Sequence, residues 1–204
     1  MARIKGGVLK GKVGPTVRTS WNGIEVVRAL PQRPKNAWSE RQIMHRERFK
    51  AINEYCKKYK YSLIPQIWNL TAEYGHGYNA FLSANSPAFA LDGQLTDVDK
   101  LHFSAGELPL PQQLKAKRSE SDASKVEVSW MNDENLSPVF SHDELMMVAG
   151  FPDHFTAPIA TGVLRKKGEA LIDLPEDFEN IGGIWLFFRA NKKDGYSGDQ
   201  YFGI

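Results

Sequence analysis

The chain has 204 residues, of which 42% are hydrophobic and 25% charged, and this balance is typical of a folded globular protein and excludes a disordered chain. Cys56 is the single cysteine, which excludes an intrachain disulfide and a cysteine-rich metal site. The basic N-terminus lacks a following apolar segment, and no later apolar stretch reaches about 18 residues. We therefore expect no signal peptide, no membrane contact, and a cytoplasmic or virion-associated protein.

Charge is divided unevenly along the chain. Residues 1–61 contain 15 of the 26 Lys and Arg residues but only 4 of the 24 Asp and Glu residues, so their net charge is +11 and that of the remaining 143 residues is −9. Such asymmetry indicates either a polyanionic partner or two oppositely charged parts that face each other or a neighbouring copy. A helix with a solvated basic face is the alternative structural interpretation.

A β-hairpin is predicted around Asn22-Gly23, since both residues tolerate the positive φ of a tight turn between β-prone flanks. The register of this hairpin pairs Trp21 with Ile24, Thr19 with Val26 and Val17 with Arg28 on one face. A two-stranded hairpin is marginally stable in water, so this arm should pack on the rest of the chain or on another subunit. We expect Trp21 and Trp38 to be buried against the helices.

A helix is predicted after Ser39-Glu-Arg-Gln42, which has the spacing of a capping box. Its apolar residues share one stripe, and Phe49 is the residue we assign to the core; the stripe is Ile43, Phe49, Ile52, Cys56 and Tyr59. Pro65 and Gly75-His-Gly77 interrupt the apolar pattern that follows. Two further short helices are therefore expected within residues 37–100.

The hydrophobic period changes near residue 101. Residues 126–130 alternate in polarity, and compact apolar runs at 144–150 and 184–190 are separated by tight-turn signals. This spacing is typical of an antiparallel β-sandwich, with Trp130 in its core. The predicted fold is α+β, and the predicted domains are a basic β-hairpin arm (1–36), a helical segment with a linker (37–100) and a self-contained sandwich (101–204).

The segment 101–203 resembles a fibronectin type III domain in its first two strands, with Leu114 and Ala116 followed by Val126, Val128 and Trp130, and in Leu174-Pro175 before the strand at 184–190. A tyrosine corner is missing from it. The whole chain resembles an uncharacterised Bacteroidetes domain-of-unknown-function family. That resemblance rests on Gly11-Lys-Val-Gly14, Ser20-Trp-Asn-Gly23, Arg28, Pro31, Gln42, Arg46, Phe49, Ser104-Ala-Gly106, Leu108 and Leu174-Pro175. It implies no activity, ligand or catalytic residue.

The sequence contains no convincing motif for catalysis, nucleotide binding or metal binding. Residues 6–12 match the spacing of a phosphate-binding loop, but Val13 stands where Ser or Thr would bind magnesium, and Gly14-Pro15 prevents the helix that must follow. The five histidines show no paired metal spacing, and Ser141-His142-Asp143 is too local to form a catalytic triad. We therefore expect no catalytic residue, metal or cofactor, and not an enzyme.

The basic N-terminal region is the candidate contact for a polyanion or another subunit, through Arg3, Lys5, Lys10, Lys12, Arg18, Arg28, Arg33 and Lys35. The leading interpretation is a non-enzymatic structural or assembly protein that acts by protein–protein contacts in a homo-oligomer or phage-like particle. The alternative is a nucleic-acid-binding protein that uses the same basic residues, with tryptophans available to stack on bases.

Overall fold

A computed structural model describes the chain except for residues 1–2, 6–7, 32–37, 73–75, 133–136 and 192–194. The chain forms two compact units, residues 1–39 and residues 40–204, and each is described by itself. The predicted N-terminal arm falls in the first unit. The predicted helical segment and sandwich fall together in the second.

The N-terminal unit is a four-stranded antiparallel sheet in the order β1-β2-β3-β4. Its strands are β1 (Arg3–Lys5), β2 (Val8–Val13), β3 (Thr16–Trp21) and β4 (Ile24–Ala29). Asn22 and Gly23 have φ values of 48° and 81°, as the predicted turn requires. All three predicted pairs of the β3–β4 register are confirmed. The hairpin is thus part of a wider sheet than the sequence indicated.

The phosphate-loop-like segment has no suitable structure in its described part. Gly6 and Gly7 lie outside the described residues, while Gly11 and Lys12 lie within strand β2. A turn and another strand follow them, whereas a phosphate site needs the N-terminus of a helix.

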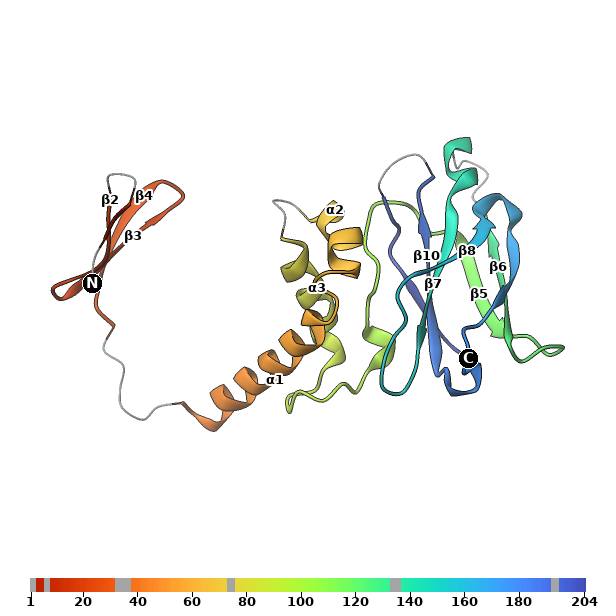
Figure 1. Cartoon of the computed structure of the whole chain (residues 1–204), viewed down its shortest axis with the longest axis horizontal. Helices are drawn as coiled ribbons and strands as arrows, with labels where there is room; N and C mark the ends of the chain where they lie inside the picture. Colours follow the sequence, from red (N-terminus) through yellow and green to blue (C-terminus); the bar gives the residue numbers. More distant parts are fainter. Residues whose placement is uncertain (1–2, 6–7, 32–37, 73–75, 133–136, 192–194) are drawn as a thin grey trace. The chain divides into compact units, whose positions relative to one another are not determined.

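The second unit begins with helices, which Figure 1 shows beside the sandwich. They are α1 (Glu40–Lys57), the π-helical turn η1 (Ile64–Trp68), α2 (Asn69–Thr71), α3 (Gly77–Asn85), and the 3-10 turns η3 (Ser86–Ala88) and η4 (Val98–Lys100). Helix α1 begins directly after Ser39, where the capping box predicts its start. Pro65 is accommodated in the first turn of η1.

The assignment of Phe49 to the core is wrong, because its side chain is 57% exposed. The buried residues of α1 are Ile52, Tyr55 and Cys56. Their face continues through Arg48, whose guanidinium donates hydrogen bonds to the carbonyl oxygens of Ser86 and Phe89 at 2.8 and 3.1 Å. Phe49 follows Arg48 and so points about 100° around the helix from that contact.

The sandwich consists of two antiparallel sheets, in the orders β5-β6-β9 and β11-β10-β7-β8. The first sheet contains β5 (Gln112–Arg118), β6 (Lys125–Met131) and β9 (Glu169–Asp173). The second contains β7 (Glu144–Gly150), β8 (Ile159–Leu164), β10 (Gly183–Arg189) and β11 (Gln200–Gly203). The 3-10 turns η5 (Pro138–His142), η6 (Arg165–Lys167) and η7 (Phe178–Asn180) lie in the connections.

Trp130 lies in the core of the sandwich, as the sequence predicted, with 5% of its surface exposed. Its indole N–H donates to the Arg165 carbonyl oxygen at 2.9 Å, and its ring centroid lies 5.6 Å from that of Phe188. The indole is therefore both packed and hydrogen-bonded, as a buried tryptophan requires.

A second core lies on the other face of the sheet β11-β10-β7-β8. Met146 and Val148 of β7, with Trp185 and Phe187 of β10, pack there against the helical segment. Intervening residues of the same strands, such as Leu186, belong to the core between the two sheets. Strands β7 and β10 are thus buried on both faces, and Figure 1 shows the helices covering the outer face of their sheet.

This packing bears on the prediction that residues 101–204 are self-contained. Removal of residues 40–100 would expose four large side chains of β7 and β10, at a cost of about 6–12 kcal/mol at 1.5–3 kcal/mol each. A typical domain has a total stability of about 5–15 kcal/mol. We expect residues 40–204 to unfold cooperatively on heating, while residues 101–204 alone bind a hydrophobic dye and show no cooperative transition by circular dichroism. A cooperative melt of the shorter fragment would instead support a self-contained sandwich.

Candidate interaction surface of the N-terminal sheet

The two faces of the N-terminal sheet differ in polarity. Residues directly opposite each other on paired strands share a face, so the register places Val17, Thr19 and Trp21 of β3 together with Ile24, Val26 and Arg28 of β4. We call its four apolar members, Val17, Trp21, Ile24 and Val26, the apolar face. The other face bears Arg18, Ser20, Glu25 and Val27. A sheet with such a division normally covers its apolar side with another layer.

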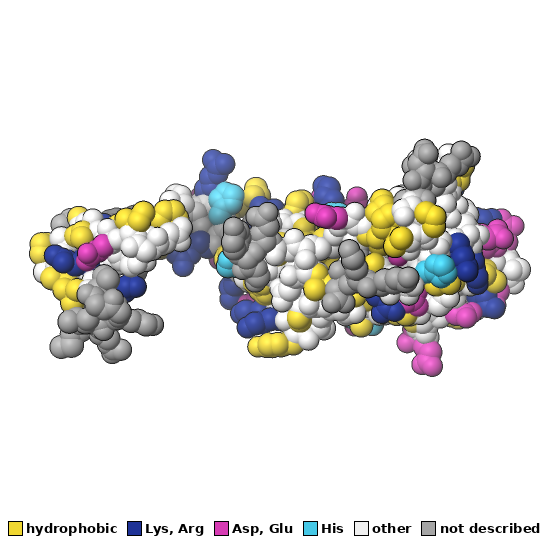
Figure 2. Space-filling view, turned by 90° about the horizontal axis from the view of Figure 1, so that it is seen from above, with side chains coloured by type: hydrophobic (Ala, Val, Ile, Leu, Met, Phe, Trp, Pro, Cys, Tyr) yellow, Lys and Arg dark blue, Asp and Glu magenta, His cyan; other side chains and the backbone are white. Residues whose placement is uncertain are grey.

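No such cover exists within the described part of this unit, since none of residues 9–31 is buried. Trp21 is 69% exposed, Ile24 63% and Val26 36%. Figure 2 shows hydrophobic side chains beside basic ones on the surface of the sheet. Exposure of a contiguous apolar group of this kind marks an interaction surface more often than single exposed residues do.

The basic residues predicted to make contacts are spread over the unit. Lys12 and Arg28 both lie opposite Val17, so they share the apolar face. Arg18 lies on the other face, where its Nη1 is 4.0 Å from a carboxylate oxygen of Glu25. The remaining candidates are Lys10 in β2, Arg3 and Lys5 in β1, whose side chains are not described, and Arg33 and Lys35, which lie outside the described residues.

Neither tryptophan is buried within its own unit, where Trp21 is 69% and Trp38 62% exposed. The apolar face was therefore not among the features predicted from the sequence. A usable signal was present, because the hairpin register already placed Trp21 beside Ile24 and diagonal to Val26. Burial was assumed for the indole because most large aromatic side chains are buried.

Buried polar groups in the second unit form structural links. Asp143 and Arg165 are 2% and 1% exposed, and Asp143 Oδ2 lies 3.9 Å from Arg165 Nη1. Burial raises the pKa of Asp143 and lowers that of Arg165, while their mutual attraction opposes both shifts. The Arg165 guanidinium also donates to the Pro109 carbonyl oxygen and lies over the Phe188 ring. This pair joins the turn before β7 to the turn after β8.

Asp199 makes a second link. Its carboxylate, 1% exposed, accepts hydrogen bonds from the backbone N–H groups of Phe103 and Ser104 and lies 2.9 Å from Nδ1 of His102. The segment between helices and sandwich is thereby tied to the start of β11. The hydrogen bond to Asp199 raises the pKa of His102.

Groups for metal binding are not brought together in the described part of the chain. No three His, Cys, Asp or Glu side chains among these residues could hold a metal ion. Burial raises the pKa of the Cys56 thiol to about 12, so a thiolate is disfavoured there. The Ser141 hydroxyl contacts the His142 ring, but the Asp143 carboxylate lies beside the Arg165 guanidinium, so these three residues do not form a triad. No described helix has the length and apolarity to span a membrane.

These observations define a class of protein: a helix-covered antiparallel β-sandwich preceded by a basic four-stranded sheet with an uncovered apolar face. Residues 8–199 match the model of a family of unknown function, DUF6266, and the chain belongs to that family. The expected membership in an uncharacterised family is thus confirmed. Neither the search of curated proteins nor the search of solved structures gave a match.

The His102–Asp199 pair predicts a pH dependence. Because the folded pKa of His102 lies above its unfolded value of about 6.5, the charged pair stabilises the fold fully below that pH and its contribution is lost as pH rises through the folded pKa. The free energy of unfolding of the parent should therefore fall more steeply above pH 6.5 than that of H102Q. Urea titrations at several pH values measure this difference.

H154Q is the matched control for that experiment. His154 also lies 2.8 Å from a carboxylate, that of Asp153, but both side chains are largely exposed, and exposed pairs contribute little to stability. If H102Q followed the pH profile of the parent, the imidazolium–carboxylate pair would have no role in folding.

Proposed function

We propose that this chain is a non-enzymatic structural or assembly protein, cytoplasmic or virion-associated, whose N-terminal sheet attaches to another protein subunit in a homo-oligomer or phage-like particle. The observation that supports this proposal is the uncovered apolar face of Val17, Trp21, Ile24 and Val26. An antiparallel sheet needs a packed face to be stable, and the described part of this unit has none of its own.

Energetics favour a covered state. Trp21, Ile24 and Val26 are 69%, 63% and 36% exposed, so burial of what remains exposed would contribute about 3–5 kcal/mol before the cost of association is subtracted. Strand β4 is also the edge of the sheet, and an edge strand can pair with an extended segment of a partner. Both features direct a partner to the same hairpin.

Charge indicates which partner fits. Residues 1–39 contain eight basic residues and one acidic residue, a net charge of +7, whereas residues 40–204 have a net charge of −5. Like charge disfavours the packing of two N-terminal sheets against each other. An acidic protein surface suits the sheet, and the second unit of a neighbouring copy offers one.

We also propose that the sandwich is a domain of the fibronectin type III kind. Its sheets have three and four strands, and the chain passes between them in the sequence β5-β6, β7-β8, β9, β10-β11. Domains of this architecture commonly serve as structural modules on surfaces. On the strength of the sequence resemblance, we also propose that the protein comes from a member of the Bacteroidetes.

The test is the mass in solution of the full chain and two variants, measured by light scattering after gel filtration. We expect the parent to be oligomeric and W21S/I24S to be monomeric, because the double variant removes most of the apolar face. V27S is the control, since Val27 is 53% exposed but lies on the opposite face. A parent that stays monomeric at high concentration would contradict the proposed homo-oligomer. If W21S/I24S formed an oligomer of the same mass as the parent and V27S, the apolar face would not be the contact between subunits.

Nucleic-acid binding is the second candidate, supported by the placement of Lys12 and Arg28 on the face that also presents Trp21. Cations beside an exposed aromatic ring suit a phosphate backbone with a stacked base. Each phosphate contact adds about −0.9 to the slope of log affinity against log salt on duplex DNA.

Under this second function, K12Q/R28Q should reduce the magnitude of the salt slope by about 2. R18Q should change it less, because Arg18 lies on the other face beside Glu25. Fluorescence anisotropy with a labelled duplex at increasing salt measures all three slopes. Absence of binding by the parent at low salt would remove this candidate.

A further inference from the structure

A cleft of about 680 Å³ lies in the second unit, between the C-terminal end of α1, the β7–β8 connection and the ends of strands β10 and β11. Volumes of this size hold drug-sized ligands. Several apolar side chains of the lining keep solvent-exposed surface, namely Leu95, Val98, Phe151, Phe155, Pro158 and Tyr201. The cleft is therefore a concave apolar surface that a partner can reach.

Glycines leave room at one end of the cleft. Gly183 of β10 pairs with Gly150 of β7 on one side and with Gly203 of β11 on the other, so the three strands lack side chains at one level. A Cβ atom on Gly183 would collide with the Tyr201 ring. The missing side chain lets that ring lie close to the backbone of β10.

Hydrogen bonds hold the rim of the cleft. The Phe151 N–H donates to the His154 carbonyl oxygen at 2.8 Å, and the rings of these two residues are stacked with centroids 4.6 Å apart. The Gly182 N–H donates to the Gly150 carbonyl oxygen at 3.0 Å, which joins two sides of the cleft. A surface that is already ordered loses little entropy when a partner binds.

The two sides of the cleft differ in charge. Asp153 belongs to the lining, and exposed Asp99 in η4 and Glu179 in η7 each follow or precede a lining residue in the chain. The end of α1 contributes positive charge, from Lys58 in the lining and from two neighbouring lysines. The loops beside the sandwich are therefore the acidic side of the cleft, and the end of α1 is its basic side.

The N-terminal sheet carries a convex apolar group of matching size. Trp21 and Ile24 stand on either side of the Asn22-Gly23 turn and pair with each other, so both lie on one face at the tip of the hairpin. They are 69% and 63% exposed. Together these two side chains are smaller than the ligands that a cleft of this volume holds. An aromatic anchor that enters a pocket is the usual centre of a protein interface.

We propose that the cleft receives the hairpin tip of a neighbouring copy, with Trp21 and Ile24 against the apolar lining. Lys12 and Arg28 lie on the same face but farther from the turn, so they would meet the acidic loops and set the orientation. The net charges of +7 for residues 1–39 and −5 for residues 40–204 favour the same contact. This inference rests on the proposed function and adds the receiving site.

Such a contact is head-to-tail, because the tip and the cleft are different surfaces of the chain. Contacts of this kind generate rings or filaments, whereas a two-fold dimer would pair one surface with itself. The two arrangements can be told apart with variants that lose only the tip or only the cleft.

The test is the mass in solution of full-length variants, measured by analytical ultracentrifugation. A157R places a long cationic side chain at the cleft, since Ala157 lines it and is exposed. We expect A157R to be monomeric, as W21S/I24S is. A123R is the matched control, because Ala123 is also exposed but lies in the β5–β6 connection outside the cleft lining, and it should have the mass of the parent.

A mixing experiment tests the head-to-tail contact directly. W21S/I24S keeps an intact cleft, and A157R keeps an intact hairpin tip. An equimolar mixture of these two monomers should form a heterodimer of twice the monomer mass, because each such pair retains one complete contact.

Charge reversal tests the same site without filling it. D153K/E179K changes two exposed side chains, so folding should be unaffected, while association should weaken about tenfold or more. Addition of K12E/R28E to the same chain should restore the association. E120K, at an exposed position of the β5–β6 connection, is the control.

The outcomes separate this inference from the proposed function. If W21S/I24S is monomeric but A157R and D153K/E179K associate as the parent does, the apolar face attaches elsewhere, and only the cleft is overturned. A mixture of W21S/I24S and A157R that stays monomeric would overturn the head-to-tail contact. A monomeric parent would remove the proposed homo-oligomer together with its receiving site.

Discussion

Burial of strands β7 and β10 on both faces is the constraint on which the second unit depends. Alternate residues of these strands enter two different cores, one between the sheets and one beneath the helices. Neither face can be left to solvent without exposing large apolar side chains. The helical segment is consequently a third layer of the sandwich, although the change of hydrophobic period near residue 101 suggests a separate domain.

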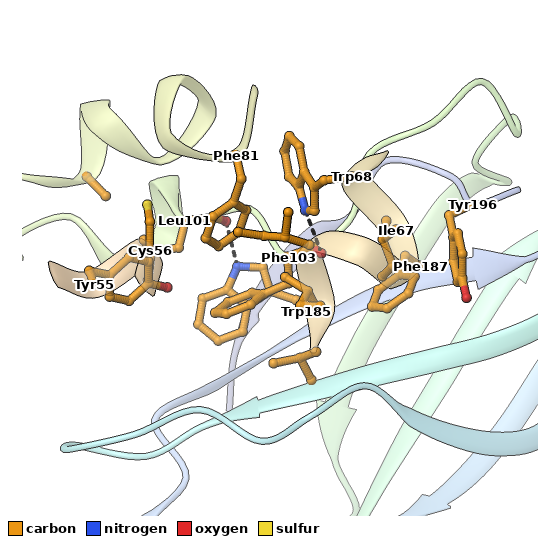
Figure 3. Close-up of a cluster of buried hydrophobic side chains, with 14 of the residues drawn as sticks. Tyr55, Cys56, Ile67, Trp68, Phe81, Leu101, Phe103, Trp185, Phe187 and Tyr196 are labelled. Atoms are coloured by element: carbon orange, nitrogen blue, oxygen red, sulfur yellow. Dashed lines mark hydrogen bonds between the residues drawn. The ribbon is translucent and has the colours of Figure 1, made fainter. Parts of the chain in front are cut away.

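The same constraint sets the path of the chain between the helices and the sandwich. A buried indole needs an acceptor for its N–H group, and Trp185 finds one in the Leu101 carbonyl oxygen at 2.9 Å. Trp68 donates to the Phe103 carbonyl oxygen at 3.2 Å, so two indoles from opposite layers hold one short segment, as Figure 3 shows. Asp199 then accepts the N–H groups of that segment, which keeps its backbone polar groups satisfied inside the core.

Local signals in the sequence were sufficient for some of these elements. The β3–β4 register follows from the Asn22-Gly23 turn alone, and the core position of Trp130 follows from the alternation of its own strand. Phe49 was misplaced because its position on the α1 stripe gave no sign that Arg48 would make the contact with the carbonyl groups of Ser86 and Phe89. The alignment of Gly150, Gly183 and Gly203 was not predictable either, because it arises from long-range pairing of three strands.

The two units differ in how far they bury their own apolar side chains, and this difference bears on function. In the second unit each face of the central sheet has a cover supplied by the same unit, and its buried charges are hydrogen-bonded or lie near a group of opposite charge. In the N-terminal unit, strands of similar β-propensity form a regular sheet whose described residues include none that is buried. Selection for stability of an isolated sheet would favour polar residues at Trp21 and Ile24, because exposed apolar side chains on a sheet promote aggregation. Under the proposed attachment to another subunit, Trp21 and Ile24 would fill the apolar centre of the interface, and Lys12 and Arg28 would meet acidic groups at its margin.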